Sequence, residues 1–525
     1  MLTGSREFVL HDGAGAGPDV LHAVAGTVSD SIAWANGGPV TTRRRTWLDT
    51  FDWRLYRAGL TLEQVTARGR VELTLTGRDG EVLASEPLPA DRKVSWPSLV
   101  AALPPGPLRE LLEPVAGIRA LSPVARAGSR VAELRAVNDD AKTIARLAVD
   151  RMSVTFPARG VAPARLTLSP VRGYQSQADK AARLLAGVPG VSAGRASALD
   201  TALAAAGCRP GELAGKAAAI SLSPAMPAAT AMAATLAALL DSLEANVPGT
   251  VRDIDTEFLH DLRIAVRWTR SALKLCRSAL PDGLAARFEP EFRWLGDLTT
   301  PTRDLDVYLL GFDGMAAALI GATELELAPF RAYLLKSRAG AYRQLTRGLR
   351  SARFVRLTAD WRAALAGVRA ARRRPTVAQL ADARIAAAHR KALRAGQLIT
   401  PSSPAQSLHD LRKRCKELRY LVEMFGSLHD PAQRWQAVRE LKALQDTLGE
   451  FQDAEVQRDE IRAFAGQMLA DRSAPAETLL AMGEIAAGLA IRQRDARARF
   501  DGRFADFASP ASQARLSELA RTSAS

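Results

Sequence analysis

The sequence is poor in the residues that build disulfide frameworks, zinc sites and aromatic binding surfaces. It has 525 residues, of which 3 are cysteines and 6 are histidines, and aromatic residues make up 6%. A sparse, odd set of cysteines argues against a disulfide framework and is typical of a reducing compartment. The histidines show no close paired spacing of the kind that zinc requires. We therefore expect no metal, no cofactor and a cytoplasmic location.

Recognisable targeting and membrane segments are also missing. Residues 1–10 contain no basic segment followed by an apolar run, so no signal peptide is expected. The uncharged stretch 217–240 is long enough to span a bilayer. However, it consists mostly of alanine with serine and threonine, and Pro224 and Pro227 interrupt it. We interpret it as a linker that runs into a helix, and we expect no membrane partner.

Positive charge, in contrast, is abundant. The chain has 71 Lys and Arg against 56 Asp and Glu, a formal net charge of +15 and a sequence pI near 10.2. Such a balance favours anionic partners, namely nucleic acid, an anionic membrane surface or polyphosphate. The length predicts two or more domains, and a hydrophobic content of 47% is enough to build their cores.

A basic helical motif occurs twice, 149 residues apart. The first copy is His260-Asp261-Leu262-Arg263 followed by Arg267, Arg270 and Lys274, and the second is His409-Asp410-Leu411-Arg412 followed by Lys416 and Arg419. Steps of three, four and three residues place side chains on one helical face, over about 15 Å of helix. Apolar residues, including Cys276 and Cys415, follow a neighbouring seam with the same step and are expected in the core.

The duplication extends beyond these two helices. Arg303-Asp304-Leu305-Asp306-Val307 corresponds to Gln452-Asp453-Ala454-Glu455-Val456 at the same offset, and Leu295-Gly296-Asp297 corresponds to Leu448-Gly449-Glu450. A repeat of this length is not a solenoid period. It predicts two related helical modules that form one domain.

The chain divides by pattern into four parts. Residues 1–190 predict an α+β domain with an antiparallel sheet, because short runs such as 46–50, 70–76, 143–153 and 165–168 mix polar and apolar residues as half-buried strands do. Residues 191–228 are rich in Ala, Gly and Pro and predict a linker. Residues 229–505 are predicted to be helical almost without break, with repeats at 229–375 and 376–505, and 506–525 form a tail. Among the predicted helices are 284–298 and 302–311 in the first repeat, and 433–448 and 450–470 in the second.

The repeated motif resembles the CHAD domain, the "conserved histidine α-helical domain". Four segments match in order: the two basic helices and the two Leu-Gly segments with the acidic residues that follow them. The resemblance implies an all-α bundle with internal two-fold pseudosymmetry that binds inorganic polyphosphate through a basic surface. Trp268 stands where the family often has a second arginine, and we expect it to lower affinity or to pack against its neighbours. The predicted polyphosphate-binding residues are His260, Arg263, Arg267, Arg270, Lys274, Arg303, Arg338, His389, His409, Arg412, Lys413, Lys416 and Arg419.

The N-terminal part resembles the CYTH domain, whose fold is an antiparallel β barrel or tunnel. The matching segments are 47–52, 55–60 and 73–76, together with a strand pair over 139–150. The acidic and basic residues of the family's active site are mostly absent, because only Glu7 remains of the first acidic strand and Arg165-Leu166-Thr167-Leu168-Ser169 replaces the last one. Arg126, Arg130 and Asp150 stand in matching places but do not make a metal site. One carboxylate cannot fix an octahedral ion, so we expect no triphosphatase activity.

Two other functions compete with polyphosphate binding. A nucleic-acid-binding protein would share the positive charge, although single strands usually require exposed aromatic residues for stacking. Residual metal-dependent triphosphatase activity in the CYTH-like domain is the second. The motif histidines are as consistent with neutral residues at the edge of the core as with ligand donors. Polyphosphate binding would also allow the protein to be located at polyphosphate granules.

Overall fold

The computed structural model describes residues 6–10, 26, 33–88, 95–194, 196–211, 220–369 and 375–521. The chain separates into two compact units, Met1–Gly215 and Lys216–Ser525. We call them the sheet unit and the helical unit, and describe each by itself. The predicted order, an α+β domain followed by an all-α domain, is confirmed.

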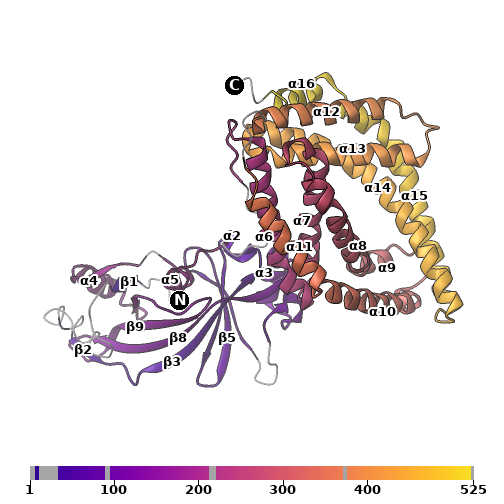
Figure 1. Cartoon of the computed structure of the whole chain (residues 1–525). Helices are drawn as coiled ribbons and strands as arrows, with labels where there is room; N and C mark the ends of the chain where they lie inside the picture. Colours follow the sequence, from indigo (N-terminus) through magenta and orange to yellow (C-terminus); the bar gives the residue numbers. More distant parts are fainter. Residues whose placement is uncertain are drawn as a thin grey trace. The chain divides into compact units, whose positions relative to one another are not determined.

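The described part of the sheet unit contains one antiparallel sheet of 12 strands (Figure 1). Its main order is β12-β1-β11-β9-β8-β3-β4-β5-β6, while β10 pairs with β9, and β2 and β7 pair with β8. The strands are β1 (Arg6–Leu10), β2 (Ala33–Asn36), β3 (Thr41–Thr50), β4 (Thr61–Ala67), β5 (Arg70–Thr76), β6 (Val82–Leu88), β7 (Ser98–Leu99), β8 (Ala120–Val137), β9 (Thr143–Phe156), β10 (Gly160–Val161), β11 (Ala164–Pro170) and β12 (Val191–Ala193).

Short helices cover parts of both faces of this sheet. They are α2 (Arg54–Arg57), the 3-10 helix η1 (Val100–Ala102), α3 (Pro107–Ala116), α4 (Gln175–Ala186) and α5 (Ala198–Ala205). Leu108 and Leu112 of α3 pack in one core cluster, and Leu185 of α4 packs in a second. Leu199 and Leu203 of α5 pack against Trp47 in a third cluster. These helices bury apolar side chains that alternate along the strands.

The strands predicted over 46–50, 70–76, 143–153 and 165–168 are present. The strand pair expected over 139–150 is wrong, because residues 143–150 belong to the single strand β9. The longest strand of the sheet was not predicted. Its sequence, ALSPVARAGSRVAELRAV, spans 18 residues and contains Pro123, Gly128 and five alanines, which have low strand propensity. β8 nevertheless pairs with both β3 and β9, so ladders on two sides hold it extended. Tertiary pairing outweighs local propensity here.

The helical unit contains α6 (Ala228–Val251), α7 (Thr256–Leu275), α8 (Leu284–Leu310), α9 (Phe312–Ala317), α10 (Glu324–Leu349), α11 (Ala352–Ala366), α12 (Val377–Gln397), α13 (Ala405–Met424), α14 (Pro431–Ala470), α15 (Ala476–Phe507) and α16 (Pro510–Leu519). The 3-10 turns η2 (Arg277–Ala279) and η3 (Gly426–Leu428) follow α7 and α13. In this unit α12 lies beside α13, and α14 lies beside α15 (Figure 1).

The internal repeat is visible in the helices. In both halves a helix of 20 residues, α7 or α13, is followed by a 3-10 turn and then by a long helix, α8 or α14. Just before α6 and α12, the backbone N–H of Ala228 donates to the carbonyl oxygen of Pro375 (3.0 Å), and that of Val377 donates to Met226 (2.8 Å). The paired positions Pro227 and Thr376 also differ by 149 in number. Equivalent backbone segments thus exchange equivalent hydrogen bonds, as expected about a two-fold axis.

Several predicted boundaries require correction. The helices predicted at 284–298 and 302–311 form one helix, α8, and those predicted at 433–448 and 450–470 form one helix of 40 residues, α14. The predicted linker 191–228 is too long, because β12 pairs with β1 and α5 packs in the sheet unit. Residues 212–219 of that linker lie outside the described part. The predicted tail contributes α16, whose Leu516 and Leu519 are buried in the helical core.

The cores of the helical unit fix the rotation of its helices. Leu262 and Leu273 of α7, like Leu411 and Leu418 of α13, are fully buried in one cluster. The expected core positions of Cys276 and Cys415 are confirmed, and burial raises the pKa of each thiol to about 12. Among the described residues, α6 is the one helix long and apolar enough to span a membrane, and 50% of its most apolar window is buried.

Candidate functional site

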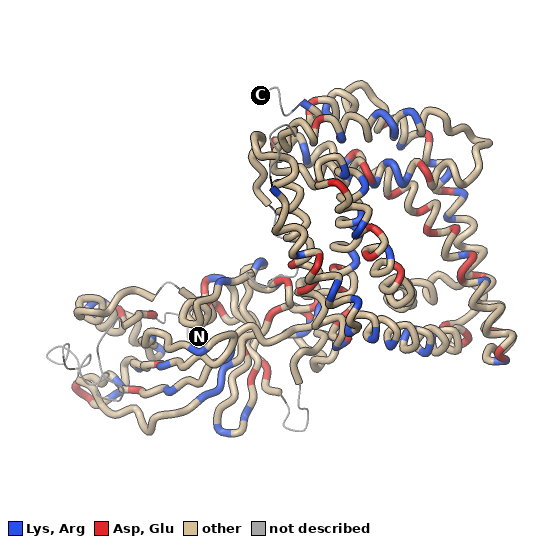
Figure 2. The backbone as a smooth tube through the Cα atoms, in the orientation of Figure 1, with Lys and Arg blue, Asp and Glu red and all other residues tan. Residues whose placement is uncertain are grey.

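The basic face of α7 is set by the start of the helix and by its buried seam. Asp255 caps α7, because its carboxylate accepts hydrogen bonds from the backbone N–H of Glu257 (3.0 Å) and Phe258 (3.2 Å). Because Leu262 and Leu273 point into the core, the residues on the neighbouring face of α7 point outward. Lys and Arg positions therefore recur along α7, and the same holds for α13 (Figure 2).

The two basic helices meet through two aromatic residues. Trp268 of α7 and Tyr420 of α13 pack with ring centroids 5.5 Å apart. The guanidinium of Arg267 lies 5.7 Å from the centroid of Tyr420, and that of Arg419 lies 6.0 Å from it. A ring between two guanidinium groups provides cation–π attraction that partly offsets their mutual repulsion. Tyr420 thus holds the two basic faces together, and the predicted packing of Trp268 against its neighbours is confirmed.

Lys416 of α13 lies among cations close to this contact. Burial is the largest cause that lowers the pKa of its ammonium group, to about 8, and Arg412, Arg267 and Arg419 lower it further while Asp453 opposes them. Arg267 is the residue of α7 that the repeat makes equivalent to Lys416, since the two numbers differ by 149. Equivalent cations of the two halves are therefore close enough to repel each other.

A second group of cations lies where α7 packs on α8. The Nη1 atom of Arg263 donates to the hydroxyls of Thr300 (2.7 Å) and Thr299 (3.1 Å). Burial lowers the pKa of Arg263, and nearby Arg267, Arg303 and Arg270 lower it further, against the opposing effect of Asp304. The charges of these four arginines therefore interact with one another.

Glycines allow this close packing in both halves. A Cβ atom on Gly296 of α8 would lie 2.8 Å from Nη1 of Arg270, and one on Gly449 of α14 would lie 3.3 Å from Nη2 of Arg412. The Leu-Gly segment of each repeat therefore leaves room for a guanidinium group from the neighbouring basic helix. The repeated sequence contains this signal, although its purpose is evident only from the packing.

Other predicted cations already have carboxylate partners. Arg412 contacts Asp453 (3.0 Å), Arg419 contacts Glu423 (3.3 Å), Lys274 contacts Glu417 (2.6 Å) and Lys413 contacts Asp410 (3.4 Å). Asp453 therefore orients Arg412. Most of these pairs are partly exposed, so each contributes little stability and can open for a competing anion.

Two residues of the predicted set do not join this surface. Arg338 is held between Asp253 (2.6 Å) and Asp306, and both carboxylates raise its pKa. His389 is buried, with its ring edge-on to Phe507 at 5.9 Å, and burial lowers its pKa. Neither residue is therefore expected to contact an anion, because Arg338 is already paired with two carboxylates and His389 is buried. His260 and His409 are half-buried on the two basic helices.

Five of the predicted cations remain without a carboxylate within 4.0 Å among the described residues: Arg263, Arg267, Arg270, Arg303 and Lys416. We call these five residues the central cations. Sequence reasoning missed Thr299 and Thr300, which hold Arg263, and the role of Tyr420, whose ring lies beside Arg267. Tyr420 belongs to the segment that follows Lys416 in the second repeat, but no contact of its ring could be predicted from that segment.

The end of the basic face near Arg412 opens into a cavity of about 540 Å³. Its lining includes Arg412, Arg492 and Arg499 beside four carboxylates, which belong to Asp446, Glu450, Asp453 and Asp495. Arg499 pairs with Glu450. The charges of this cavity therefore largely neutralise one another, in contrast to the central cations.

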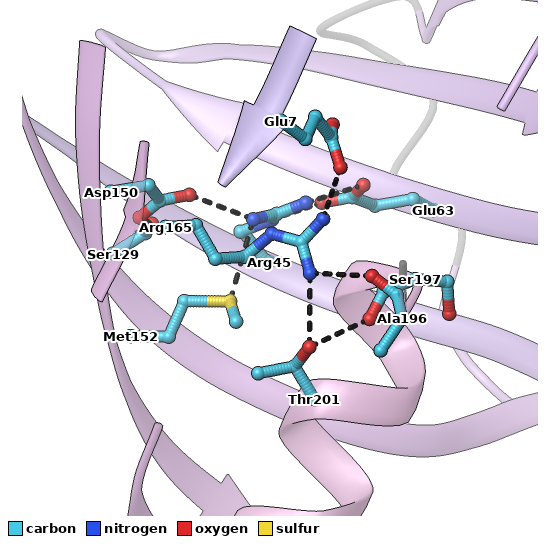
Figure 3. A network of polar contacts seen from close by, with 10 residues as sticks. All are labelled: Glu7, Arg45, Glu63, Ser129, Asp150, Met152, Arg165, Ala196, Ser197 and Thr201. Carbon is cyan, nitrogen blue, oxygen red and sulfur yellow. Dashed lines mark hydrogen bonds and ion pairs between the residues drawn. The ribbon is translucent and has the colours of Figure 1, made fainter. Parts of the chain in front are cut away.

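The sheet unit holds a different charge network, which is partly buried (Figure 3). Arg45 contacts Asp150 (2.8 Å) and Glu63, and Arg165 contacts Glu7 and donates to Thr201 Oγ1 (2.9 Å). Burial alone would lower the pKa of Arg45, but Glu63 and Asp150 together raise it. Each of these carboxylates is thus committed to an arginine rather than left to bind a cation.

Arg126 and Arg130 do not join Asp150, although all three occupy matching places in the sequence comparison. They are exposed on β8, whereas the intervening Ser129 is buried and hydrogen-bonds to Asp150. Because neighbouring residues of a strand point to opposite faces, both arginines lie on the face away from the network.

The fold and these contacts define a class of protein, an all-helical domain of two related halves with cations gathered where the halves meet. Residues 234–462 match the family model of the CHAD domain, so the helical unit contains a CHAD domain. No curated protein is similar enough in sequence to count as a relative.

Solved structures of similar fold include the CHAD domain from the plant Ricinus communis, with 23% identity over 55% of this chain and 95% of that chain and a TM-score of 0.46. PptA from Streptomyces chartreusis has 17% identity over 53% and 99%, with a TM-score of 0.41. HpAC1 from Hippeastrum, described as an adenylyl cyclase with a dominant triphosphatase activity, has 13% identity over 40% and 98%, with a TM-score of 0.26. These likenesses are too distant to add to the assignment.

Proposed function

We propose that the CHAD domain binds inorganic polyphosphate and does not alter it chemically. The observation that carries this proposal is the meeting of α7 and α13, where equivalent residues Arg267 and Lys416 lie close together without a carboxylate partner among the described residues. Placing like charges close together costs free energy that a bound anion would recover. The proposed site consists of the central cations, with Arg412 and Arg419 joining when their ion pairs open.

A flexible chain of closely spaced phosphates suits this arrangement. Arginine forks bind phosphate oxygens through paired charge-assisted hydrogen bonds, and the released counterions add a favourable entropy. The central cations follow α7 and reach α8 and α13, so they form an extended track rather than an enclosed pocket. An extended anion can contact all five, whereas a single orthophosphate cannot.

Single-stranded nucleic acid suits the surface less well. Its bases stack on exposed aromatic rings. At this surface Tyr420 is 5% exposed, and its ring packs against Trp268 and lies beside Arg267 and Arg419. The aromatic residues therefore have a structural task here and are not free for bases.

The decisive experiment is calorimetric titration of the full chain with long-chain polyphosphate. Charge reversal of Arg267→Glu with Lys416→Glu should weaken binding about a hundredfold, because two charge-assisted contacts become repulsive. The control is Arg343→Glu with Arg347→Glu on α10, which changes the net charge equally at exposed positions. Helical circular dichroism should be the same in all three proteins.

Equal weakening by both pairs would refute the site. The milder pair Arg267→Gln with Lys416→Gln covers the case in which reversal disturbs folding. Competition with single-stranded DNA at fixed salt addresses the other candidate, and DNA that displaces polyphosphate at equal charge concentration would favour nucleic-acid binding.

We further propose that the sheet unit has no metal-dependent triphosphatase activity. The ion pairs of Arg45 and Arg165 with Glu7, Glu63 and Asp150 support this, since they use the carboxylates that would hold Mg²⁺. Tripolyphosphate incubated with the full chain and Mg²⁺ should release no phosphate. On this proposal the protein works in the cytoplasm, at polyphosphate granules.

A further inference from the structure

A pocket of about 780 Å³ lies on the sheet unit, lined by residues of β3, β8, β9 and the β4–β5 turn. Five of its lining residues are arginines: Arg43, Arg44, Arg68, Arg130 and Arg151. Among the described residues, no aspartate or glutamate belongs to the lining. This composition differs from the cavity beside Arg412, where arginines and carboxylates alternate.

The pocket lies mainly on the face opposite to the buried network of Figure 3. Arg130 and Ser153 are exposed, while their strand neighbours Ser129 and Met152, which also belong to the lining, are buried beside Arg45. Alternation along β8 and β9 therefore places most of the two sets of side chains on opposite faces of the sheet. The two polar regions do not share their arginines.

The arginines of the pocket are largely uncompensated. Among the described residues, Arg43, Arg44, Arg68 and Arg130 have no carboxylate within ion-pair distance. The hydroxyls of Thr42, Thr66 and Ser153 belong to the same lining and add hydrogen-bond donors. Four guanidinium groups around one hollow repel each other until an anion enters.

The β4–β5 turn carries one of these arginines at a position with left-handed backbone. Arg68 and Gly69 are its two central residues, with φ of 48° and 77°. A turn of this type favours Asn or Gly at its first position, because left-handed backbone costs about 1 kcal/mol for other residues. An arginine at this position bears that cost while placing a cation at the pocket.

We propose that this pocket is a second binding site for a phosphate-chain anion, separate from the CHAD surface. Several arginine forks and hydroxyls in one hollow match the oxygens of two or three linked phosphates. Both an inorganic tripolyphosphate and the phosphate tail of a nucleotide carry this chemistry. The site holds the anion without hydrolysing it, since no lining carboxylate could bind a metal.

The test uses the full chain carrying Arg267→Gln and Lys416→Gln, so that the CHAD surface is weakened. Titration with tripolyphosphate should still show one binding event. Arg44 and Arg130 are both exposed. Adding Arg44→Glu and Arg130→Glu to this chain should weaken its affinity for tripolyphosphate at least about thirtyfold, as expected for the loss of two phosphate contacts. The matched control adds Arg70→Glu and Arg126→Glu, exposed arginines of β5 and β8 outside the lining, and should change affinity less than about threefold.

Absence of binding in the CHAD-weakened chain, or an equal loss with the control pair, would overturn the second site. Neither result would affect the CHAD assignment, which the first titration tests. A parallel titration with ATP identifies the source of the phosphate. If ATP binds with the same affinity as tripolyphosphate, only the phosphate chain is bound. If ATP binds more tightly, the apolar part of the lining, which includes Val40 and Ala132, also contacts the nucleoside.

Discussion

The charge of Lys416 depends strongly on its surroundings. Burial and three neighbouring arginines bring its pKa to about 8, from the ordinary value of 10.5. The ammonium group is thus mostly charged at neutral pH and mostly neutral above pH 9. The equivalent position in the first half, Arg267, carries a guanidinium group instead of an amine. The two halves therefore differ in their response to pH.

This difference leads to a prediction about the pH dependence of binding. A bound polyanion stabilises the charged ammonium and so raises the pKa of Lys416 above about 8. Affinity is then full below that pKa and falls as pH rises through it, because the free protein loses the proton before the complex does. Between pH 7 and pH 9.5 the affinity for long-chain polyphosphate should fall about tenfold, corresponding to about one pKa unit.

Lys416→Arg is the control for this effect. Arginine keeps the charge but does not titrate, so the variant should bind at pH 7 and retain its affinity at pH 9.5. Titration calorimetry in two buffers of different ionisation enthalpy should also show proton uptake above pH 7.5 in the wild type alone. Identical pH profiles for the wild type and the variant would exclude Lys416 from the site.

At the scale of elements, the helical repeat works through paired helices in which a glycine faces an arginine. Gly296 on α8 leaves room for Arg270, and Gly449 on α14 leaves room for Arg412. The long helices α8 and α14 thus act as supports that fix where guanidinium groups lie. Glycine inside a helix costs up to about 1 kcal/mol, so an equivalent glycine in both halves indicates a packing requirement.

Replacing one of these glycines should separate binding from stability. In Gly296→Ala the new Cβ would displace the flexible end of Arg270, with little effect on folding, while the affinity for polyphosphate falls about fivefold through loss of one positioned contact. Gly466→Ala on α14 is the matched control, because nothing lies within 4 Å of a Cβ there. It should raise the thermal midpoint and leave binding unchanged. Unchanged binding in Gly296→Ala would show that Arg270 is not a contact.

The helices show what the sequence could predict and what it could not. Helical periodicity predicted the basic faces of α7 and α13, because a buried leucine seam fixes the rotation of each helix. It could not reveal the partners of those cations. Asp306 lies 32 residues from Arg338, and neutralises it only because α8 packs on α10. In the same way, the apolar partner of His389 is Phe507, on another helix.

The continuity of α8 and α14 could not be predicted from the local sequence either. Pro301 and the preceding threonines favoured a break in α8, and Gly449 favoured one in α14. Packing against α7 and α13 keeps both helices continuous. In the sheet unit the same limit applied to β8, whose alanines and glycine gave no strand signal. Local signals were reliable for apolar periodicity and unreliable where tertiary contacts decide the conformation.

At the scale of the whole molecule, a net charge of +15 raises the question whether polyphosphate would bind the chain anywhere. Long-range attraction depends on total charge and is screened by salt over about 10 Å at 0.1 M. A local site instead depends on which cations lie together. The described structure places carboxylates beside many exposed arginines, such as Arg287, Arg353 and Arg362, and leaves the central cations without them. Distribution rather than total charge should therefore govern binding.

The dependence of affinity on salt concentration distinguishes these two cases. If the five central cations release counterions as in binding to a single-stranded polyanion, the slope of log K against log salt should be about −3.5, at roughly −0.7 per phosphate contact. Arg267→Gln with Lys416→Gln removes two contacts and should reduce the slope to about −2. Arg343→Gln with Arg347→Gln removes the same net charge from α10 and should leave the slope near −3.5. Equal reduction by both pairs would mean that total charge, and not the track between α7 and α13, binds the polyanion.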